Sequence, residues 1–203
     1  MSQAVFSLPY FGSIHYFKSL VKYNEVWLES SENYQKQSQR NRQYIYGANG
    51  KLMLNIPVKH SRSQKRLKYI DSQIENDFEW QALHFKSLAS AYRTSPYFEF
   101  YEADIEPLYT KTYSHIFEFN KDCFDLIIRL LGLDLEYKPT TEYIENYNDE
   151  DDMRYLVKAK TKQKIEMKPY HQVFEDKHGF ISNLSILDLV FNLGPESLVY
   201  LKQ

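Results

Sequence analysis

The sequence predicts one domain of the α/β class, or of the α+β class, that opens strand–helix–strand, continues with a β-hairpin and is mainly helical in its second half. Three observations predict this. Short β-branched and aromatic runs flank a stretch with helical spacing, two apolar arms flank the loop "GANG", and the second half repeats apolar residues with a helical period. A length of 203 residues suits one domain, 1–203, with an α/β part, 1–76, and a helical part, 77–203.

The opening segments predict two parallel strands. "AVFSLPY" is short, β-branched and aromatic, and Pro9 stops it; "EVWLE" has the same character. The stretch "GSIHYFKSLVKY" between them has apolar residues at helical spacing, namely Ile14, Phe17, Leu20 and Val21. A strand–helix–strand order favours a parallel pair joined by a right-handed crossover.

A hairpin is expected next, because "QYIY" and "KLMLNIPV" flank "GANG", whose glycines can take positive φ. The second arm alternates, and its predicted buried face consists of Leu52, Leu54, Ile56 and Val58. "YIDSQIE", residues 69–75, is a further candidate strand.

Three helices are predicted in the second half. Residues 78–92 have one face made of Trp80, Leu83, His84, Ser87, Leu88, Ala91 and Tyr92. "PYFEFYEADIEPLYTK" predicts another helix, and "FNKDCFDLIIRLLGL" predicts one with Asn120 as N-cap and Gly132 as its end.

The last third carries two further signals. "YNDEDDMRYLVKAKTKQK", residues 147–164, places acids before bases, which suits either a helix macrodipole or a mobile flap. Near the C-terminus, Ser185 with Asp188 three residues later predicts a capping box, Gly194 ends that helix, and Pro195 begins another.

Composition excludes several classes of function. A net charge of −2 gives no general attraction to nucleic acid, and no apolar run reaches the length of a membrane helix. The N-terminal segment lacks the features of a signal peptide, and the single cysteine, Cys123, suits a reducing compartment, so we expect a cytoplasmic protein. The 18 tyrosines and 13 phenylalanines suit either ligand-lined clefts or an aromatic core.

Common site motifs are missing from the sequence. The six histidines form no i, i+4 pair of the kind that binds zinc on a helix, so no metal site is predicted. The sequence has no P-loop, dinucleotide glycine fingerprint or nucleophile-elbow serine, and no cofactor is indicated.

Three titratable residues are candidates for acid–base chemistry. His84 shares a helix face with Trp80 and Leu88, so it is either a base in a cleft or a hydrogen-bonded core histidine. Asp188 is either catalytic or part of its capping box, and Asp71 is a carboxylate between apolar residues.

Arg40, Asn41 and Arg42 precede the predicted hairpin. Two guanidinium groups and an amide suit binding of a phosphate or carboxylate. Arginines also protect exposed strand edges, so local chemistry leaves both interpretations open.

"GSIHYF" after an apparent strand is similar to the Gly-x-x-His turn of nucleotidylyltransferases, in which an imidazole contacts an ATP phosphate. The second histidine of that signature is absent, so the pattern is short and weakly specific.

Over nearly its whole length the chain resembles the WbqC-like family. The matching stretches, in order, are "LPYFG", "YQKQSQRNRQYIYGANGKLMLNIPV", "IDSQI", "WQALHFKSLASAYRTSPYF" and "YHQVFEDKHGFISNLSILDLVFNLGPES". The shared features are an N-R pair, here Asn41 and Arg42, a W-x3-H helix, here Trp80 and His84, and a late N-L-S-x-x-D turn ending at Asp188. Where many relatives carry acidic residues after the second strand, this chain reads "ESSEN", with Glu29 and Glu32 as the nearest equivalents.

The resemblance implies a step in the synthesis of O-antigen, capsule or other surface polysaccharides. The expected reaction is an acyl or aminoacyl transfer to an amino-sugar, with a sugar nucleotide or lipid-linked sugar and an acyl donor as small-molecule partners. We expect a cleft where the first strands, the Trp80–Tyr92 helix and the C-terminal turn converge.

Each site residue has an expected role in that cleft. Arg42 and Arg40 would hold an anionic group, and Asn41 would polarise a carbonyl. His84 would deprotonate an amine, and Asp188 or Asp71 would fix the tautomer of its imidazole. Tyr10 and Trp80 would stack on a sugar or base. The alternatives are a non-catalytic assembly module, which would leave these residues scattered, and a nucleotidylyltransferase-like enzyme.

Overall fold

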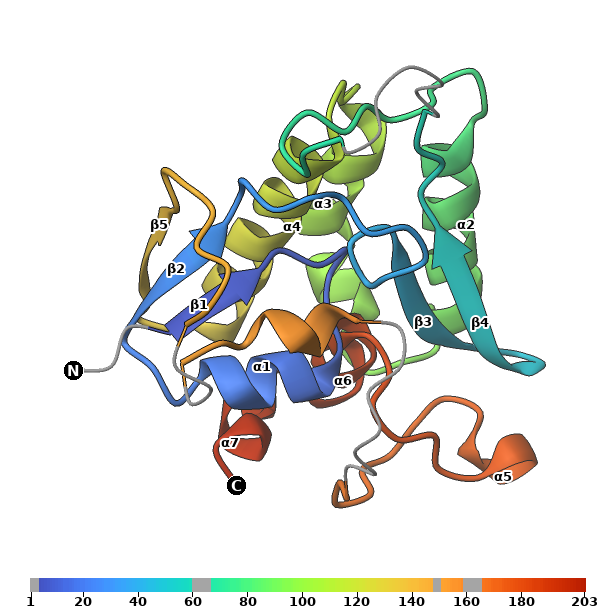
Figure 1. Cartoon of the computed structure of the whole chain (residues 1–203). Helices are drawn as coiled ribbons and strands as arrows, with labels where there is room; N and C mark the ends of the chain where they lie inside the picture. The colour runs from blue at the N-terminus through green and yellow to red at the C-terminus, as the bar shows by residue number, and fades with distance from the viewer. Residues whose placement is uncertain (1–3, 60–66, 148–150, 159–165) are drawn as a thin grey trace.

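A computed structural model of the chain describes residues 4–59, 67–147, 151–158 and 166–203 (Figure 1). The opening is as predicted: β1 (Ala4–Ser7), α1 (Ile14–Leu20) and β2 (Glu25–Glu29) follow one another, and β1 pairs in parallel with β2. Ser13 caps α1, its hydroxyl accepting a hydrogen bond from the Tyr16 amide.

The parallel sheet has a third strand that the sequence did not indicate. β5 (Glu136–Pro139) pairs in parallel with β2, so β2 lies in the centre of the order β1-β2-β5. β5 has no hydrophobic alternation, and three of its four residues are exposed, which explains why its sequence carries no strand signal. Because β5 comes from the second half of the chain, the 1–76 and 77–203 parts share this sheet.

The predicted hairpin forms from β3 (Arg42–Gly47) and β4 (Gly50–Asn55), which pair antiparallel. Gly50 has positive φ (+93°), whereas Gly47 does not. Leu54 and Ile56 are buried as predicted, but Leu52 near the turn is 41% exposed. The predicted apolar face is therefore only partly buried.

Long helices make up most of the second half: α2 (Trp80–Tyr92), α3 (Phe98–Thr110) and α4 (Ile116–Leu131). On α2, Trp80, His84 and Leu88 are buried as predicted, whereas Leu83 is 62% exposed. In Figure 1, α4 passes behind the parallel sheet, and its Phe124 packs edge-on against Tyr137 of β5 at a ring-centroid distance of 5.3 Å. Tyr16 of α1 packs in the same way on Phe6 of β1, at 5.4 Å.

Two helix details differ from the predictions. α4 begins four residues before Asn120, so Asn120 is not its N-cap; the buried amide instead donates to the Arg40 carbonyl and the Tyr69 hydroxyl, both at 2.6 Å. Gly132 ends α4 as predicted, with φ +61°.

Residues 69–75 form no strand. The Ser72 hydroxyl donates to the Lys68 carbonyl and closes a turn, and the strand-like pairing of this segment is limited to isolated bridges, such as Val58 with Ile74. Tyr69 and Ile74 are both buried, although a separation of five residues would place them on opposite faces of a strand.

Short elements complete the chain: η1 (Arg154–Val157), α5 (Glu175–His178), α6 (Ile186–Leu193), η2 (Gly194–Glu196) and α7 (Ser197–Leu201). For residues 147–164 we expected a helix or a flap; the described part of this segment contains one short helix, η1. Residues 148–150 and 159–164 lie outside the described residues. Ser185 caps α6 as predicted, accepting from the Leu187 amide. No helix in the described ranges is both long and apolar enough to cross a bilayer.

Candidate functional site

Polar side chains gather where the parallel strands end. Glu29, the last residue of β2, is fully buried, and its Oε1 accepts hydrogen bonds from the Thr140 hydroxyl (2.9 Å) and the Ser31 amide (2.8 Å). Ser7, the last residue of β1, donates to Glu32 Oε1 at 2.6 Å. Open α/β sheets bind ligands at this carboxyl edge, so this is the first place to look for a site.

Arg40 belongs to this edge and is already paired. Its side chain is 1% exposed, and its Nη2 and Nε donate to Glu32 Oε1 at 2.6 and 3.0 Å. Nη2 also donates to the Ser7 hydroxyl at 3.1 Å. The anion that Arg40 holds in this structure is therefore the Glu32 carboxylate.

Arg154 attaches a distant segment to the same edge. Its Nη2 donates to Asp152 Oδ2 at 2.7 Å, and its Nη1 lies 3.5 Å from Glu29 Oε2. The guanidinium carbon also lies 4.9 Å from the ring centroid of Tyr147 and 5.3 Å from that of Tyr143.

Some of these groups, with neighbouring residues, line a cavity of about 340 Å³, which we call the edge cavity. Its lining residues are Glu32, Gln35, Arg40, Tyr143, Glu145, Asp152, Arg154, Tyr155 and Lys158. The edge cavity brings carboxylates and cations together at the end of the parallel sheet, an arrangement that can both hold an anionic ligand and accept a proton.

A second cavity, of about 130 Å³, shares Lys158 with the first. We call it the amide cavity; it is lined by Gly12, Ser13, Gln39, Gln43, Tyr44, Lys51, Lys158, Asn183 and Ser185. These residues come from the β1–α1 loop, the loop before the hairpin, the hairpin, the residue after η1 and the turn before α6. The β1–α1 loop and the C-terminal turn meet at this cavity, whereas α2, which we expected to share the cleft, does not line it.

Asn41 and Arg42 lie together at the entry to the hairpin. Asn41 Nδ2 and Arg42 Nε both donate to Asn55 Oδ1, at 2.9 and 3.2 Å. Asn41 Oδ1 is buried and has no hydrogen-bond partner within the described part of the chain. The two residues thus meet at Asn55 and line neither cavity.

His84 is enclosed by aromatic rings. Its Nδ1 lies 2.9 Å from the Tyr10 hydroxyl, which in turn lies 2.9 Å from the Tyr109 hydroxyl. Burial lowers the pKa of His84 to about 4, against a smaller opposing effect of the Asn55 backbone. The imidazole is therefore neutral at pH 7.

The two expected stacking residues surround His84 instead of a cavity. The Tyr10 ring is stacked on His84 with centroids 5.7 Å apart, and the Trp80 ring meets it edge-on at 5.3 Å. Tyr10 is 0% and Trp80 4% exposed. In this conformation neither ring offers a free face to a sugar or base.

Asp188 and Asp71 lie in different surroundings. Asp188 is buried and accepts hydrogen bonds from the Tyr92 hydroxyl (2.8 Å), the Tyr170 hydroxyl (2.5 Å) and the Gln172 amide (2.8 Å). Burial raises its pKa, and these three donors oppose that rise. Its carboxylate thus joins three segments and does not close the predicted capping box.

Asp71 is exposed, in the turn after Tyr69. Neither aspartate is hydrogen bonded to His84 among the described residues, so the group at His84 Nδ1 is the Tyr10 hydroxyl and not a carboxylate. The predicted fixing of the tautomer by Asp188 or Asp71 has no counterpart in this arrangement.

Of the eight residues expected to form the site, only Arg40 lines either cavity. Arg154 and Lys158 were not considered from the sequence, and Glu32 was named only as a nearest equivalent of the acidic residues of relatives. Its place after the end of a predicted parallel strand is a second, weak signal for Glu32. No local signal connects Arg154 with the sheet edge, since their contact depends on the path of the chain over more than a hundred residues.

The Gly-x-x-His segment forms the tight turn before α1. Phe11 and Gly12 both have positive φ, and a Cβ on Gly12 would lie 2.8 Å from the Pro9 ring. The His15 amide donates to Asn183 Oδ1 at 2.9 Å, and burial, then Lys22 and Lys18, lowers the pKa of its imidazole. His15 does not line the amide cavity.

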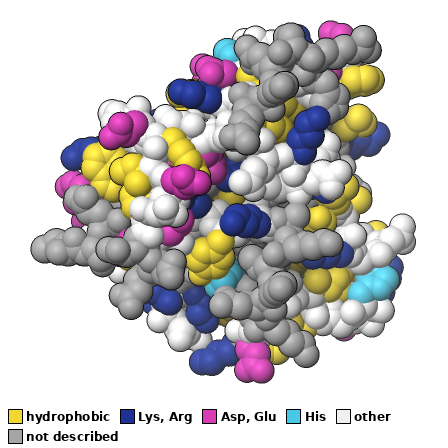
Figure 2. Space-filling model, in the orientation of Figure 1, with side chains coloured by type: hydrophobic (Ala, Val, Ile, Leu, Met, Phe, Trp, Pro, Cys, Tyr) yellow, Lys and Arg dark blue, Asp and Glu magenta, His cyan; other side chains and the backbone are white. Residues whose placement is uncertain are grey.

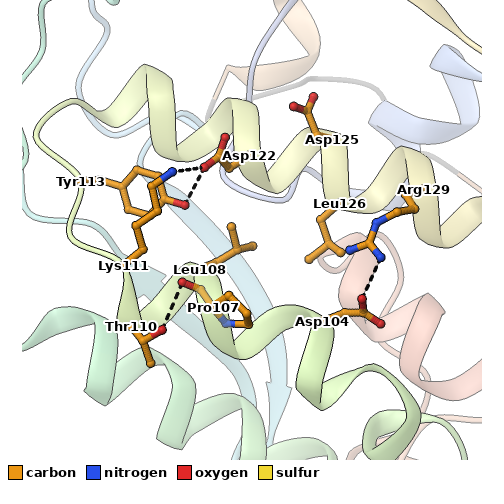
Figure 3. A pocket seen from close by; sticks show the side chains of 10 residues that line it. All are labelled: Asp104, Pro107, Leu108, Thr110, Lys111, Tyr113, Asp122, Asp125, Leu126 and Arg129. Atoms are coloured by element: carbon orange, nitrogen blue, oxygen red, sulfur yellow. Dashed lines mark hydrogen bonds and ion pairs between the residues drawn. The ribbon is translucent and has the colours of Figure 1, made fainter.

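A larger cavity, of about 620 Å³, lies between α3 and α4 (Figure 3). Its charged groups already pair across it: Lys111 with Asp122 and Arg129 with Asp104, each at 2.8 Å. It contains no residue singled out from the sequence, and no unpaired charge recommends it as the site. No group of His, Cys, Asp and Glu suited to a metal ion occurs in the described ranges.

Comparison with known proteins identifies the family. The model of the WbqC-like protein family matches residues 7–166, well over half of the chain. The chain belongs to the WbqC-like protein family. Both cavities of this WbqC-like protein draw most of their lining from the matched residues, whereas Asp188 and the N-L-S-x-x-D turn lie beyond them. No curated protein and no solved structure matches the chain.

Proposed function

We propose that this WbqC-like protein is a transferase of surface-polysaccharide synthesis that acts on a sugar linked to a nucleotide or lipid phosphate. Membership of the family supports the pathway, and the edge cavity supports the chemistry. The observation that carries the proposal is the Glu32 carboxylate lining the same cavity as Arg154 and Lys158, at the carboxyl edge of a parallel sheet.

The proposed reaction is an acyl or aminoacyl transfer to an amino-sugar. The sugar amine attacks the carbonyl carbon of an activated acyl donor; a C–N bond forms, and the C–S or C–O bond of the donor breaks. Glu32 accepts the proton that the amine loses, and the leaving thiolate or alkoxide is protonated by solvent. Lys158 binds the phosphate of the substrate, and Arg154, whose donors go to Asp152, Ile144 and Glu145, contributes positive charge beside it.

Arg40 acts in this proposal as a positioning residue. Two of its nitrogens and the Ser7 hydroxyl all donate to Oε1 of Glu32, which fixes the carboxylate in one orientation. The second candidate for the base is His84, which is neutral at pH 7 as a base must be. It requires an opening of the Tyr10–Trp80 enclosure to reach a substrate.

The first test is a binding screen of the purified chain by thermal shift against UDP-N-acetylglucosamine, acetyl-CoA and ATP. The second is detection by mass spectrometry of acyl transfer to a UDP-linked amino-sugar. Glu32→Gln should lower the rate at least about a hundredfold, because the amide cannot accept the proton. Glu136→Gln, at an exposed position of β5, is the matched control and should retain full activity.

Each result discriminates between assignments. If His84→Gln forms no product and Glu32→Gln keeps full activity, the base is His84 and not Glu32. Stabilisation by ATP alone favours the nucleotidylyltransferase-like alternative. Circular dichroism at neutral pH must show that each variant is folded.

The second candidate function is a non-catalytic assembly module. Asn41, Arg42, His84 and Asp188 have partners within the protein and line no common cavity, which favours this alternative. Absence of both ligand stabilisation and product, for the acyl donors and sugars tested, would reject the transferase proposal in its favour.

A further inference from the structure

The amide cavity differs from the edge cavity in its charge. None of its lining residues is Asp or Glu, and two of them, Lys51 and Lys158, are basic. In the described part of the chain neither lysine forms an ion pair with a carboxylate, whereas Arg154 and Arg40 in the edge cavity both do. Lys51 Nζ lies 4.3 Å from the ring centroid of Tyr44, which positions the ammonium group by a cation–π contact.

Each amide oxygen of this cavity already accepts one hydrogen bond. Gln39 Oε1 accepts from the Ser13 amide (3.1 Å), Gln43 Oε1 from the Ser185 hydroxyl (2.7 Å) and Asn183 Oδ1 from the His15 amide (2.9 Å). Each amide oxygen keeps a second lone pair, and Gln39 Nε2 already donates to the Leu156 carbonyl at 3.2 Å. With two lysines and no carboxylate, the lining still offers more donors than acceptors to an anionic ligand.

Gln43 also presents a buried amide. Its Nε2 has no partner of ordinary hydrogen-bond geometry among the described residues, but it lies close enough to the Tyr10 and Tyr109 hydroxyls to oppose the rise of their pKa on burial. We therefore count this group with the core and not among the donors of the cavity.

The size of the cavity restricts the ligand. A volume of about 130 Å³ is well below the ~300 Å³ at which pockets for whole small molecules begin. It fits a single oxyanion group, and because Lys158 also lines the edge cavity, a larger ligand can extend from one cavity into the other.

We propose that the amide cavity is a phosphate-binding site, in which Lys51 and Lys158 supply the positive charge and amide groups supply hydrogen-bond donors. The phosphate is either a free ion or the terminal group of a larger ligand whose remainder occupies the edge cavity. The site itself does not depend on the transferase assignment; only its use as the phosphate end of that enzyme's substrate rests on the proposed function.

Isothermal titration calorimetry of the full chain at low ionic strength tests the site, with inorganic phosphate and UDP as separate probes. Wild-type protein should bind phosphate saturably, and Lys51→Gln and Lys158→Gln should each weaken binding about tenfold through loss of one charge-assisted hydrogen bond. Lys86→Gln, an exposed lysine of α2 outside both cavity linings, removes the same charge and should bind like wild type. Unfolding temperatures measured without ligand check that all three variants fold.

The two probes separate the sources of the phosphate. Tighter binding of UDP than of phosphate identifies a larger ligand that extends into the edge cavity, and equal binding identifies a free oxyanion. Absence of saturable binding to the wild type, or equal weakening by all three lysine variants, would overturn the proposal. A chain that binds phosphate but gives no transfer product keeps this site and rejects the proposed reaction.

Discussion

The role of a polar residue in this protein depends more on its hydrogen-bond and ion-pair partners than on the chemistry of its own side chain. His84, Arg40 and Asp188 are all chemically capable of catalysis, and all three are buried against partners that satisfy them. The partner of His84 is 74 residues away in the chain and that of Asp188 in α2 is 96 residues away. The sequence marks these groups as reactive and leaves open whether His84 is a base or a hydrogen-bonded core histidine, but it does not indicate the Tyr10 hydroxyl as the partner, because such distances carry no local signal.

The buried imidazole of His84 predicts a pH dependence of stability. Its pKa is lowered from 6.5 to about 4 by burial, so between these values the unfolded state binds more protons than the folded state. The titration of His84 should therefore leave the free energy of unfolding at its maximum above pH 6.5. Between pH 6.5 and pH 4 the free energy of unfolding should fall, by about 3 kcal/mol in all. Urea denaturation at a series of pH values measures this loss.

His84→Gln should remain folded at pH 7.5 and show a smaller loss of stability over the same interval. His178→Gln, at an exposed position, controls for the removal of one histidine. An identical pH dependence in wild type and His84→Gln would contradict the assigned burial effect.

At the scale of elements, segments with strong apolar periodicity were predicted correctly. The opening strand–helix–strand unit, the hairpin and the three long helices all form where the pattern indicates. Two failures concern polar residues: β5 gains its strand geometry from pairing with β2, and Asn120 lies inside α4, where its amide bonds Arg40 and Tyr69. In both cases a tertiary contact outweighs the local preference.

The two helix-ending glycines predict different costs of substitution. Gly132 has φ +61° and space around it, so Gly132→Ala should cost only the left-handed conformation, about 1 kcal/mol. Gly194 has φ +52°, and a Cβ there would lie 2.5 Å from the Tyr97 ring, so Gly194→Ala should cost about 3 kcal/mol or more. Chemical denaturation of both variants measures the difference; equal costs would show that the Tyr97 contact is not restrictive.

The whole molecule is organised around the carboxyl edge of its small parallel sheet. β1 and β2 provide Ser7 and Glu29, and the segment containing Arg154 returns to cover this edge. The Val5 amide donates to the Asp151 carbonyl and the Met153 amide to the Val5 carbonyl, so the segment pairs with β1. Basic and acidic side chains are interspersed on the face drawn in Figure 2, in keeping with the net charge of −2.

Removing Arg154 should loosen this arrangement. Arg154→Ala leaves the fully buried Glu29 without its cation, with an expected cost of about 3 kcal/mol. Hydrogen exchange at the Met153 amide should accelerate, and a second substitution, Glu29→Gln, should recover part of the stability because it removes the buried charge.

Arg129→Ala is the matched control, since it breaks an exposed ion pair with Asp104 and should cost less than about 1 kcal/mol. Equal losses in the Arg154 and Arg129 variants would contradict a role for Arg154 in attaching the segment to the sheet.

The sequence by itself determined the class of the fold, the order of its periodic elements and the resemblance to the WbqC-like family. These follow from hydrophobic spacing, turn residues and an ordered series of motifs, all of which are properties of local segments. Only the tertiary structure decided which polar groups meet: Arg40 with Glu32, His84 with Tyr10, and Lys51 with Lys158 around one cavity. The physical reason is that desolvation and hydrogen bonding depend on neighbours brought together by packing, which no local pattern encodes.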